Sequence, residues 1–333
     1  MASNGCAGSS PARGTNIEFT NNDIKVDIPN GCSPFLLIYT FTLKYISHYT
    51  YRMTYDDIWR RLAGAYDQRE ARAVARMLIE EKFGLSFADI ICGGVEALSD
   101  AGTQWLEAAV ERLEQGEPIQ YVLGWAWFCG LRFGVQPGVL IPRPETEWLV
   151  DTVCADSSAQ NARKLRVLDI GTGSGCIALS IKQRLPEAYV EAWDISPEAL
   201  AIAADNARSL DIDVAFRQQD ALNLTPESDV WDVIVSNPPY ICQRERTDMS
   251  PNVLNHEPST ALFVPDTDPL LFYRAITRYA VGSLRSGGRL LFECNTLYAV
   301  DTACMMADEG MTATEVHNDC FDKPRFAIGE KKE

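Results

Sequence analysis

The chain has 333 residues, 46% of them hydrophobic, which is enough for about two domains with substantial cores. Acidic residues outnumber basic ones 46 to 30, and the net charge of −16 disfavours a nucleic-acid substrate because it repels phosphate backbones. The sequence has no apolar run of the ~18 residues that a membrane span needs and no metal-ligand spacing among its ten cysteines and three histidines, so we expect a cytoplasmic protein without a metal site.

Residues 1–52 differ in composition from the rest of the chain. Ser, Asn, Gly and Pro are frequent in residues 1–34, and an aromatic stretch without a helical period follows. We expect residues 1–52 to be a disordered, loosely attached or non-native extension. Met53 is a candidate for the main start, since recognisable organisation begins at Thr54.

A helical period begins at Thr54, which stands three residues before Asp57 in an N-capping pattern. Apolar residues then recur at helical spacing over residues 58–66, 71–79 and 101–113. The pattern predicts a module of about four helices over residues 53–115, and Gly116 ends the last helix.

Residues 116–155 are predicted to form a hairpin and a linker. Large apolar residues broken by glycines predict a β-hairpin over residues 116–133. Residues 139–147 gather charged side chains around two prolines and lead into a helix that ends near residue 155. This stretch is either a proline-stiffened connector or part of a site, and Arg143 either shapes a cleft or forms an ion pair.

Residues 156–333 form the largest predicted domain. After a polar joint at residues 156–163, we expect strands and helices to alternate, which predicts an α/β, doubly wound, mostly parallel sheet with helices on both faces. The expected strands are 165–170, 189–194, 214–218, 231–236 and 289–293, with a terminal pair at 312–317 and 325–328; the expected helices are 176–184, 197–210 and 269–284.

A glycine-rich turn follows the first of these strands, with Asp169 just before it. It reads Gly171-Thr172-Gly173-Ser174-Gly175, and its glycines allow a ligand to approach the backbone closely. Asp194 ends the next strand, where a carboxylate can accept both hydroxyls of a ribose or cap the following helix. Asp220 follows the third strand and is either a contact for an adenine amino group or an ordinary loop residue.

The fourth strand ends abruptly at Asn237-Pro238-Pro239-Tyr240. Two prolines fix the backbone and donate no N–H, so the chain leaves the sheet as a rigid loop at its ligand-binding edge. The Asn237 side-chain oxygen and the Pro238 carbonyl are two acceptors beside the Tyr240 ring. That set suits a planar NH₂ group, although an ordinary turn has the same composition.

Together these motifs resemble class I (Rossmann-like) S-adenosylmethionine-dependent methyltransferases that act on planar nitrogens. More narrowly, the chain resembles the HemK/PrmC family of peptide chain release factor N5-glutamine methyltransferases over residues 53–330. This narrower resemblance rests on Gln120-Tyr121-x-x-Gly124, Pro142-Arg143-Pro144-Glu145-Thr146-Glu147, Glu257-Pro258-x-x-Ala261-Leu262 and Asp322-Lys323-Pro324-Arg325.

The resemblance implies roles for the site residues. Residues 171–175 would wrap the methionine and ribose of S-adenosyl-L-methionine, and Asp194 would hold the ribose. Asn237 and Pro238 would bind the glutamine amide of a Gly-Gly-Gln motif, with Tyr240 packed on it. The family often has an aromatic residue where this chain has Ala221, so we expect adenine to lean on Ile195 and Leu222, which leaves Asp220 a weaker assignment.

Three functions stay open. The first is methylation of a release factor by a monomer that docks its substrate through the helical module. The second is amino methylation of a ribosomal protein, adenine or guanine, since residues 126–130 resemble a sister family acting on a ribosomal protein and base amines are equally planar. The third is a non-enzymatic cofactor-binding protein.

Overall fold

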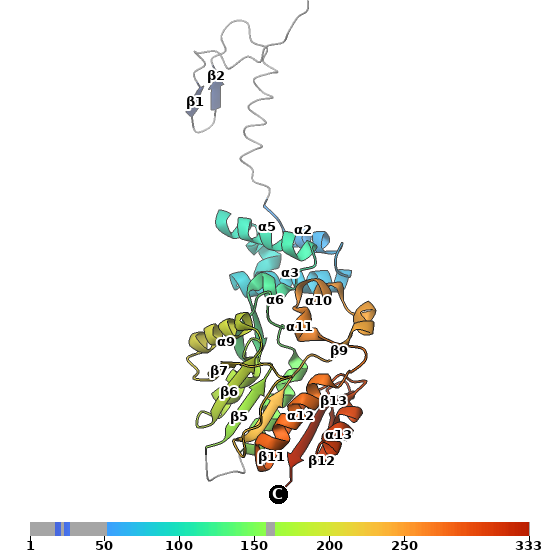
Figure 1. Ribbon diagram of the computed structural model, residues 1–333. Helices are drawn as coiled ribbons and strands as arrows, with labels where there is room; N and C mark the ends of the chain where they lie inside the picture. The colour runs from blue at the N-terminus through green and yellow to red at the C-terminus, as the bar shows by residue number, and fades with distance from the viewer. Residues whose placement is uncertain (1–16, 21–22, 27–51, 158–163, 333) are drawn as a thin grey trace, which may run out of the picture. The chain divides into compact units, whose positions relative to one another are not determined.

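The computed structural model describes residues 17–20, 23–26, 52–157 and 164–332 (Figure 1). The chain divides into two compact units, Met1–Met53 and Thr54–Glu333. In the first unit β1 (Ile17–Thr20) pairs antiparallel with β2 (Asp23–Val26), a hairpin that the sequence pattern did not predict. The rest of residues 1–51, where we expected a loose extension, lies outside the described residues.

The second unit begins with the helical module. Its elements are α2 (Tyr55–Leu62), α3 (Gln68–Phe83), α4 (Phe87–Asp89), the π-helix η1 (Ile90–Gly94) and α5 (Asp100–Glu114). The expected cap of α2 is confirmed, because Thr54 Oγ1 accepts from the Asp57 amide at 3.2 Å. Arg61 of α2 forms ion pairs with Glu107 and Glu114 of α5, which holds the two helices together.

The predicted hairpin is shorter than expected. It consists of β3 (Trp125–Phe128) and β4 (Leu131–Gly134), while the residues before it form helix α6 (Ile119–Leu123). The expectation of a strand there was wrong. Pro118 starts the helix and Gly124, with φ of 83°, ends it, so local capping overrides the β-branched composition.

The largest domain is built on a seven-stranded sheet in the order β12-β13-β11-β8-β5-β6-β7. All neighbouring pairs are parallel except those that involve β13, so the predicted doubly wound, mostly parallel sheet is confirmed. The strands are β5 (Arg166–Ile170), β6 (Tyr189–Asp194), β7 (Ala215–Gln218), β8 (Trp231–Ser236), β11 (Leu284–Glu293), β12 (Met311–Asn318) and β13 (Pro324–Lys331).

Helices cover both faces of this sheet (Figure 1). Alternate strand residues enter opposite cores; Val167 lies in one and its neighbour Leu168 in the other. The first core includes residues of α7 (Glu147–Ser157), α8 (Cys176–Arg184) and α9 (Pro197–Leu210), and the second includes residues of α12 (Leu271–Ser283) and α13 (Ala299–Asp308). The bounds of α8, α9, β6 and β8 are those expected; α13 was not predicted.

A small insertion that the sequence pattern also missed follows β8. It comprises β9 (Ile241–Cys242), the 3₁₀ helix η3 (Gln243–Asp248), α10 (Pro251–His256), α11 (Ser259–Leu262) and β10 (Phe263–Val264), with β10 parallel to β9. A second 3₁₀ turn, η2 (Pro144–Thr146), precedes α7. Glu257, just after α10, accepts from the Ile141 amide at 3.1 Å and pairs with Arg143. The insertion is therefore joined to the linker.

Candidate active site

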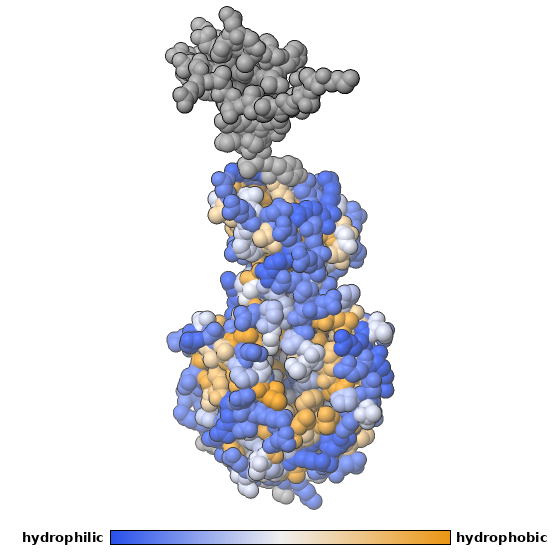
Figure 2. All heavy atoms as spheres, turned by 45° about the horizontal axis from the view of Figure 1, so that its top comes forward, coloured by the Kyte–Doolittle hydropathy of each residue, from blue (hydrophilic) through white to orange (hydrophobic). Residues whose placement is uncertain are grey.

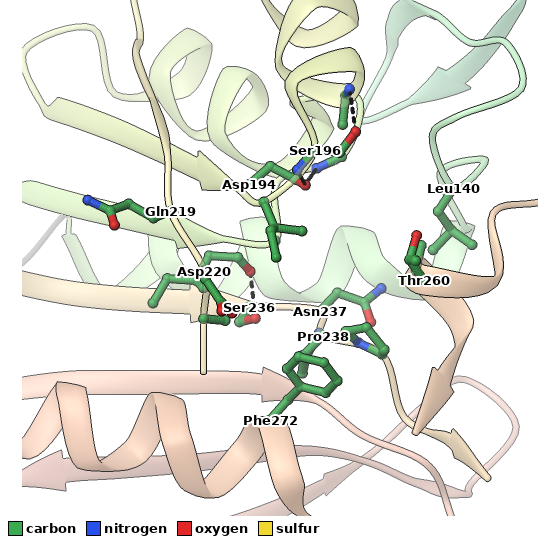
Figure 3. A pocket seen from close by; sticks show the side chains of 18 of the residues that line it. Leu140, Asp194, Ser196, Gln219, Asp220, Ser236, Asn237, Pro238, Thr260 and Phe272 are labelled. Atoms are coloured by element: carbon green, nitrogen blue, oxygen red, sulfur yellow. Dashed lines mark hydrogen bonds between the residues drawn. The ribbon is translucent and has the colours of Figure 1, made fainter. Parts of the chain in front are cut away.

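A cavity of about 400 Å³ lies where the strand order reverses, at the carboxyl ends of β5, β6 and β8. Gln219 and Asp220 lie toward one end, and Leu140 and Thr260 toward the other, close to Asn237 (Figure 3). A space-filling view shows a hollow in this part of the molecule with hydrophobic residues on both sides (Figure 2). The cavity is therefore elongated and has two chemically different ends.

The glycine-rich turn forms one wall. Gly171 and Gly173 line the cavity with φ of 77° and 55°. A Cβ on Gly173 would meet no atom within 4 Å, and one on Gly171 would meet only the Asn237 carbonyl at 4.0 Å. No side chain therefore separates this backbone from the cavity, so a ligand in the cavity can contact the backbone directly.

The other three residues of the turn do not line the cavity. Thr172 and Ser174 are buried, and the Thr172 hydroxyl donates to Asp169 at 2.6 Å. A Cβ on Gly175 would lie 3.1 Å from Ala203, so this glycine serves the packing of α8 on α9. Of the five predicted cofactor contacts in the turn, the structure brings two to the cavity.

Asp194 lies at the cavity where β6 ends. Its Oδ2 accepts from the Gly173 amide and its Oδ1 from the Ser196 amide, each at 2.9 Å. Burial raises the pKa of this carboxyl, while these backbone amides oppose the shift. Ser196, rather than Asp194, caps α9 by accepting from the Ala199 amide. Asp194 is therefore free of the capping role and is held rigidly beside the glycine turn.

Asp169 is fully buried behind the turn. Its Oδ2 accepts from the Thr172 hydroxyl, its Oδ1 has no close hydrogen-bond partner, and the Ala178 backbone amide opposes the rise in its pKa. Burial raises its pKa to about 7. Asp169 lies outside the cavity lining, so it can favour a ligand with a cationic portion only through its nearby charge.

Apolar side chains also line the cavity near Asp220. Ile195 and Leu222 line it with 57% and 40% of their surface exposed. Both oxygens of Asp220 accept from its own turn, from the Leu222 amide and the Asn223 side chain. Ala221 lies on the cavity wall. Two exposed apolar side chains therefore stand where the sequence predicted the adenine to lean.

Asn237 and Pro238 lie together near the other end (Figure 3). The Asn237 side-chain nitrogen donates to Thr146 Oγ1 at 3.3 Å. Within the described part of the chain, neither its Oδ1 nor the Pro238 carbonyl accepts a hydrogen bond. The two acceptors predicted from the sequence are thus free and adjacent.

Tyr240 lies slightly apart from these residues. With Asn237 it lines a second, neighbouring cavity of about 310 Å³, to which Arg143 and Met249 also contribute. Its hydroxyl donates to Glu293 at 3.1 Å. Pro239 lines the first cavity.

Some lining residues were missed by sequence reasoning. Phe272 and Ile276 reach the cavity from α12, Leu140 from the linker and Thr260 from α11. Phe272 and Ile276 stand four positions apart on one helix face, which indicates only burial. Thr260 lies within the Glu-Pro-x-x-Ala-Leu motif, and that motif was the only available signal.

Two family models match the chain: the PrmC N-terminal domain over residues 57–124 and the methyltransferase small domain over residues 146–259. A release factor glutamine methyltransferase from Bacteroides thetaiotaomicron is 45% identical over 82% of this chain and 98% of that protein. One from Flavobacterium psychrophilum is 37% identical over 80% of this chain and 93% of that protein. This chain belongs to the release factor glutamine methyltransferase family.

Family membership confirms several of the expectations. The protein is a methyltransferase, and its cofactor is S-adenosylmethionine. The cavity suits that cofactor, because the backbone of Gly171 and Gly173 is open to a ligand and the Asp194 carboxylate lies beside it. The Asp169 carboxylate is buried behind the turn. A methyltransferase structure from Pyrococcus furiosus aligns with a TM-score of 0.45 at 16% identity over 67% of this chain and 98% of that one. No described helix is long and apolar enough to cross a bilayer.

Proposed function

We propose that this enzyme methylates the side-chain amide nitrogen (N5) of the glutamine in the Gly-Gly-Gln motif of peptide chain release factors, which tunes translation termination. The observation that carries the proposal is the pair of free acceptors, Asn237 Oδ1 and the Pro238 carbonyl, beside the cavity. A primary amide presents two N–H donors in one plane, so it matches this pair. The names of the relatives narrow the amide to that of a release factor.

The two acceptors do more than bind. An amide nitrogen is a weak nucleophile because its lone pair is conjugated with the carbonyl. Hydrogen bonds from both N–H groups to Asn237 and Pro238 hold the nitrogen in one orientation and favour the lone pair pointing into the cavity. The described cavity lining contains no His or Lys, and its carboxylates Asp194 and Asp220 accept hydrogen bonds from backbone amides or their own turn, so positioning and electrostatics are the protein's main contributions. Methyl transfer would leave a neutral thioether, and the methylated amide nitrogen would then release one proton to water.

The cofactor residues have matching tasks. When bound, S-adenosylmethionine supplies an activated methyl group on a sulfonium. Gly171 and Gly173 would let the cofactor contact the backbone, and Asp194 would accept hydrogen bonds from the ribose hydroxyls. Ile195 and Leu222 would pack against the adenine. Apolar side chains such as Phe272 and Ile276 exclude water from the cavity.

We also propose that the helical module docks the release factor and that the enzyme is a cytoplasmic monomer. The module corresponds to the match with the PrmC N-terminal domain and precedes the catalytic domain. The net charge of −16 favours a protein substrate over a nucleic acid.

Mass spectrometry tests the function. Purified enzyme is incubated with S-adenosylmethionine and an unmethylated release factor, and the Gly-Gly-Gln peptide is then mapped. We expect one added methyl on the glutamine side chain. We expect Asn237→Ala to lower turnover by roughly 100-fold, while the cofactor Kd measured by calorimetry changes little, because the variant removes one acceptor of the reacting amide. No added methyl with intact cofactor binding would contradict the proposal and redirect the search to ribosomal proteins and nucleic acid.

A further inference from the structure

Three polar side chains from distant parts of the chain meet behind Asn237. Thr146 ends η2, Glu293 ends β11, and Tyr240 follows the prolines; Thr146 and Glu293 are each only 2% exposed. Thr146 Oγ1 donates to Glu293 Oε2 at 2.6 Å, and Tyr240 donates to Oε1 at 3.1 Å. Asn237 Nδ2 in turn donates to Thr146 Oγ1 at 3.3 Å. The four side chains form a continuous hydrogen-bond chain.

The direction of this chain follows from counting protons. An ionised carboxylate has no proton and can only accept, so the single hydroxyl proton of Thr146 belongs to Glu293. Thr146 then has only lone pairs to offer to Asn237. The NH₂ end of the Asn237 amide must therefore face Thr146, and its oxygen must face away from it.

This direction matters because the two ends of an asparagine amide have nearly the same shape. A flipped Asn237 would present its own NH₂ to the substrate amide, donor against donor. Such a pairing forfeits a hydrogen bond and leaves a desolvated donor unpaired. Asn237 can accept from a substrate amide only in the orientation that Thr146 enforces.

Several groups surround Glu293 and decide whether it is charged. Burial and the Glu145 carboxylate raise its pKa; the Thr146 and Tyr240 hydroxyls and the Arg325 guanidinium oppose the shift. The Tyr273 hydroxyl donates to the Glu293 backbone carbonyl at 3.3 Å rather than to the carboxyl group. Burial is the largest of these effects, so the pKa of Glu293 is raised overall, and the two hydroxyls and Arg325 are the groups that stabilise its carboxylate form. The carboxylate form sets the direction of the chain.

We infer that Thr146 and Glu293 are positioning residues that fix the orientation of the Asn237 amide, so that its oxygen faces the substrate nitrogen. The inference rests on the proposed function for the identity of the substrate amide. It assigns a task to Thr146, which lies in the Pro-Glu-Thr-Glu motif that the family resemblance singled out without a role, and to Glu293 at the end of β11.

Variants at Thr146 test the inference through kinetics. Thr146→Val keeps the shape and removes the hydroxyl, so kcat/KM for the release factor should fall roughly 10- to 100-fold with an unchanged cofactor Kd. Thr146→Ser restores the hydroxyl and should recover most of the activity. Thr277→Val is the matched control, because it removes a buried threonine hydroxyl that donates to the Tyr273 backbone carbonyl on its own helix. It should leave kcat/KM unchanged.

A second variant removes the acceptor end of the chain. Glu293→Met has a similar volume but no acceptor, which frees the Thr146 proton to turn toward Asn237. It should lose activity as Thr146→Val does, and the double variant should lose little more than either single one. This variant also covers the case in which Thr146→Val does not fold.

Nuclear magnetic resonance gives a readout that needs no substrate. In protein labelled with ¹⁵N-asparagine, the Asn237 side-chain amide, assigned by its loss in Asn237→Ala, should exchange slowly in the wild type and in Thr146→Ser. It should exchange faster in Thr146→Val. Equal exchange in these proteins, an active Thr146→Val, or a Thr146→Ser as impaired as Thr146→Val would overturn the inference. A wild type inactive on release factors would instead count against the proposed function, since the exchange measurement stands independently of it.

Discussion

At the scale of one residue, the buried carboxyl behind the glycine turn shows a conflict between stability and binding. Asp169 is fully buried, and one of its oxygens has no hydrogen-bond partner. Burial raises its pKa from 3.8 to about 7. The folded state therefore binds this proton more tightly than the unfolded state, and the stability gained from it is present below pH ~4 and lost as the pH rises through 7.

Asp169→Asn should remove this pH dependence. At pH 8 the ionised carboxyl destabilises the ligand-free protein by up to roughly 4 kcal/mol, the equivalent of its pKa shift. We expect the variant to have a higher Tm than the wild type at pH 8, a smaller difference near pH 5, and weaker cofactor binding. Thermal denaturation across this range, with calorimetry for the cofactor, measures all three. A variant less stable than the wild type at pH 8 would show that the ionised Asp169 carboxyl does not destabilise the folded protein.

At the scale of one element, the turn between β5 and α8 uses its glycines for different purposes. Gly173 faces the cavity with open space where a Cβ would stand, whereas Gly175 faces Ala203 and Leu179 at 3.1 Å. Both have positive φ, so any side chain is strained at either position. The first glycine leaves room for a ligand and the second leaves room for a neighbouring helix.

Alanine at these two positions should separate the two purposes. Gly173→Ala should cost about 1 kcal/mol in stability through backbone strain and weaken cofactor binding at least roughly 10-fold, because its methyl enters the cavity. Gly175→Ala should lose a further ~1–3 kcal/mol through overpacking. Denaturant unfolding and cofactor titration distinguish them. Similar losses of stability in the two variants would contradict this division.

At the scale of the whole molecule, the helical module and the insertion after β8 approach each other. The Asn252 side chain of α10 opposes the rise in the pKa of Tyr66 that burial causes, and a Cβ on Gly116, directly after the module, would lie 3.2 Å from the same side chain. The module also carries Ile91 with 62% of its surface exposed. An apolar side chain so exposed on a module proposed to dock a protein is a candidate contact.

Ile91→Asp should therefore distinguish protein from peptide substrates. We expect KM for a full-length release factor to rise roughly 10-fold, because a buried apolar contact is replaced by a charge. KM for a short Gly-Gly-Gln peptide should not change. Phe321→Asp, at an equally exposed site in the turn between β12 and β13, is the control. An unchanged KM for the full-length factor would remove Ile91 from the docking surface.

The features that depend on neighbours along the chain could be predicted from the sequence. The glycine turn, the Asn237-Pro238 pair and the alternation of strands and helices follow from local conformational preferences and from the rule that parallel strands end at one edge. Local reasoning failed where capping competed with composition, as in α6, and where no periodic signal marked the insertion after β8.

Contacts between polar groups far apart in the sequence depend on the folded chain and could not be predicted. Thr146 forms hydrogen bonds with Glu293, which is 147 residues away in the sequence, and with Asn237, which is 91 residues away. Glu257 accepts a hydrogen bond from the Ile141 amide, 116 residues away in the sequence. No spacing rule connects such residues, because their approach depends on how the linker packs over the sheet. The sequence thus named the groups that would touch the substrate amide, while the fold supplied the buried carboxylate and hydroxyl behind them.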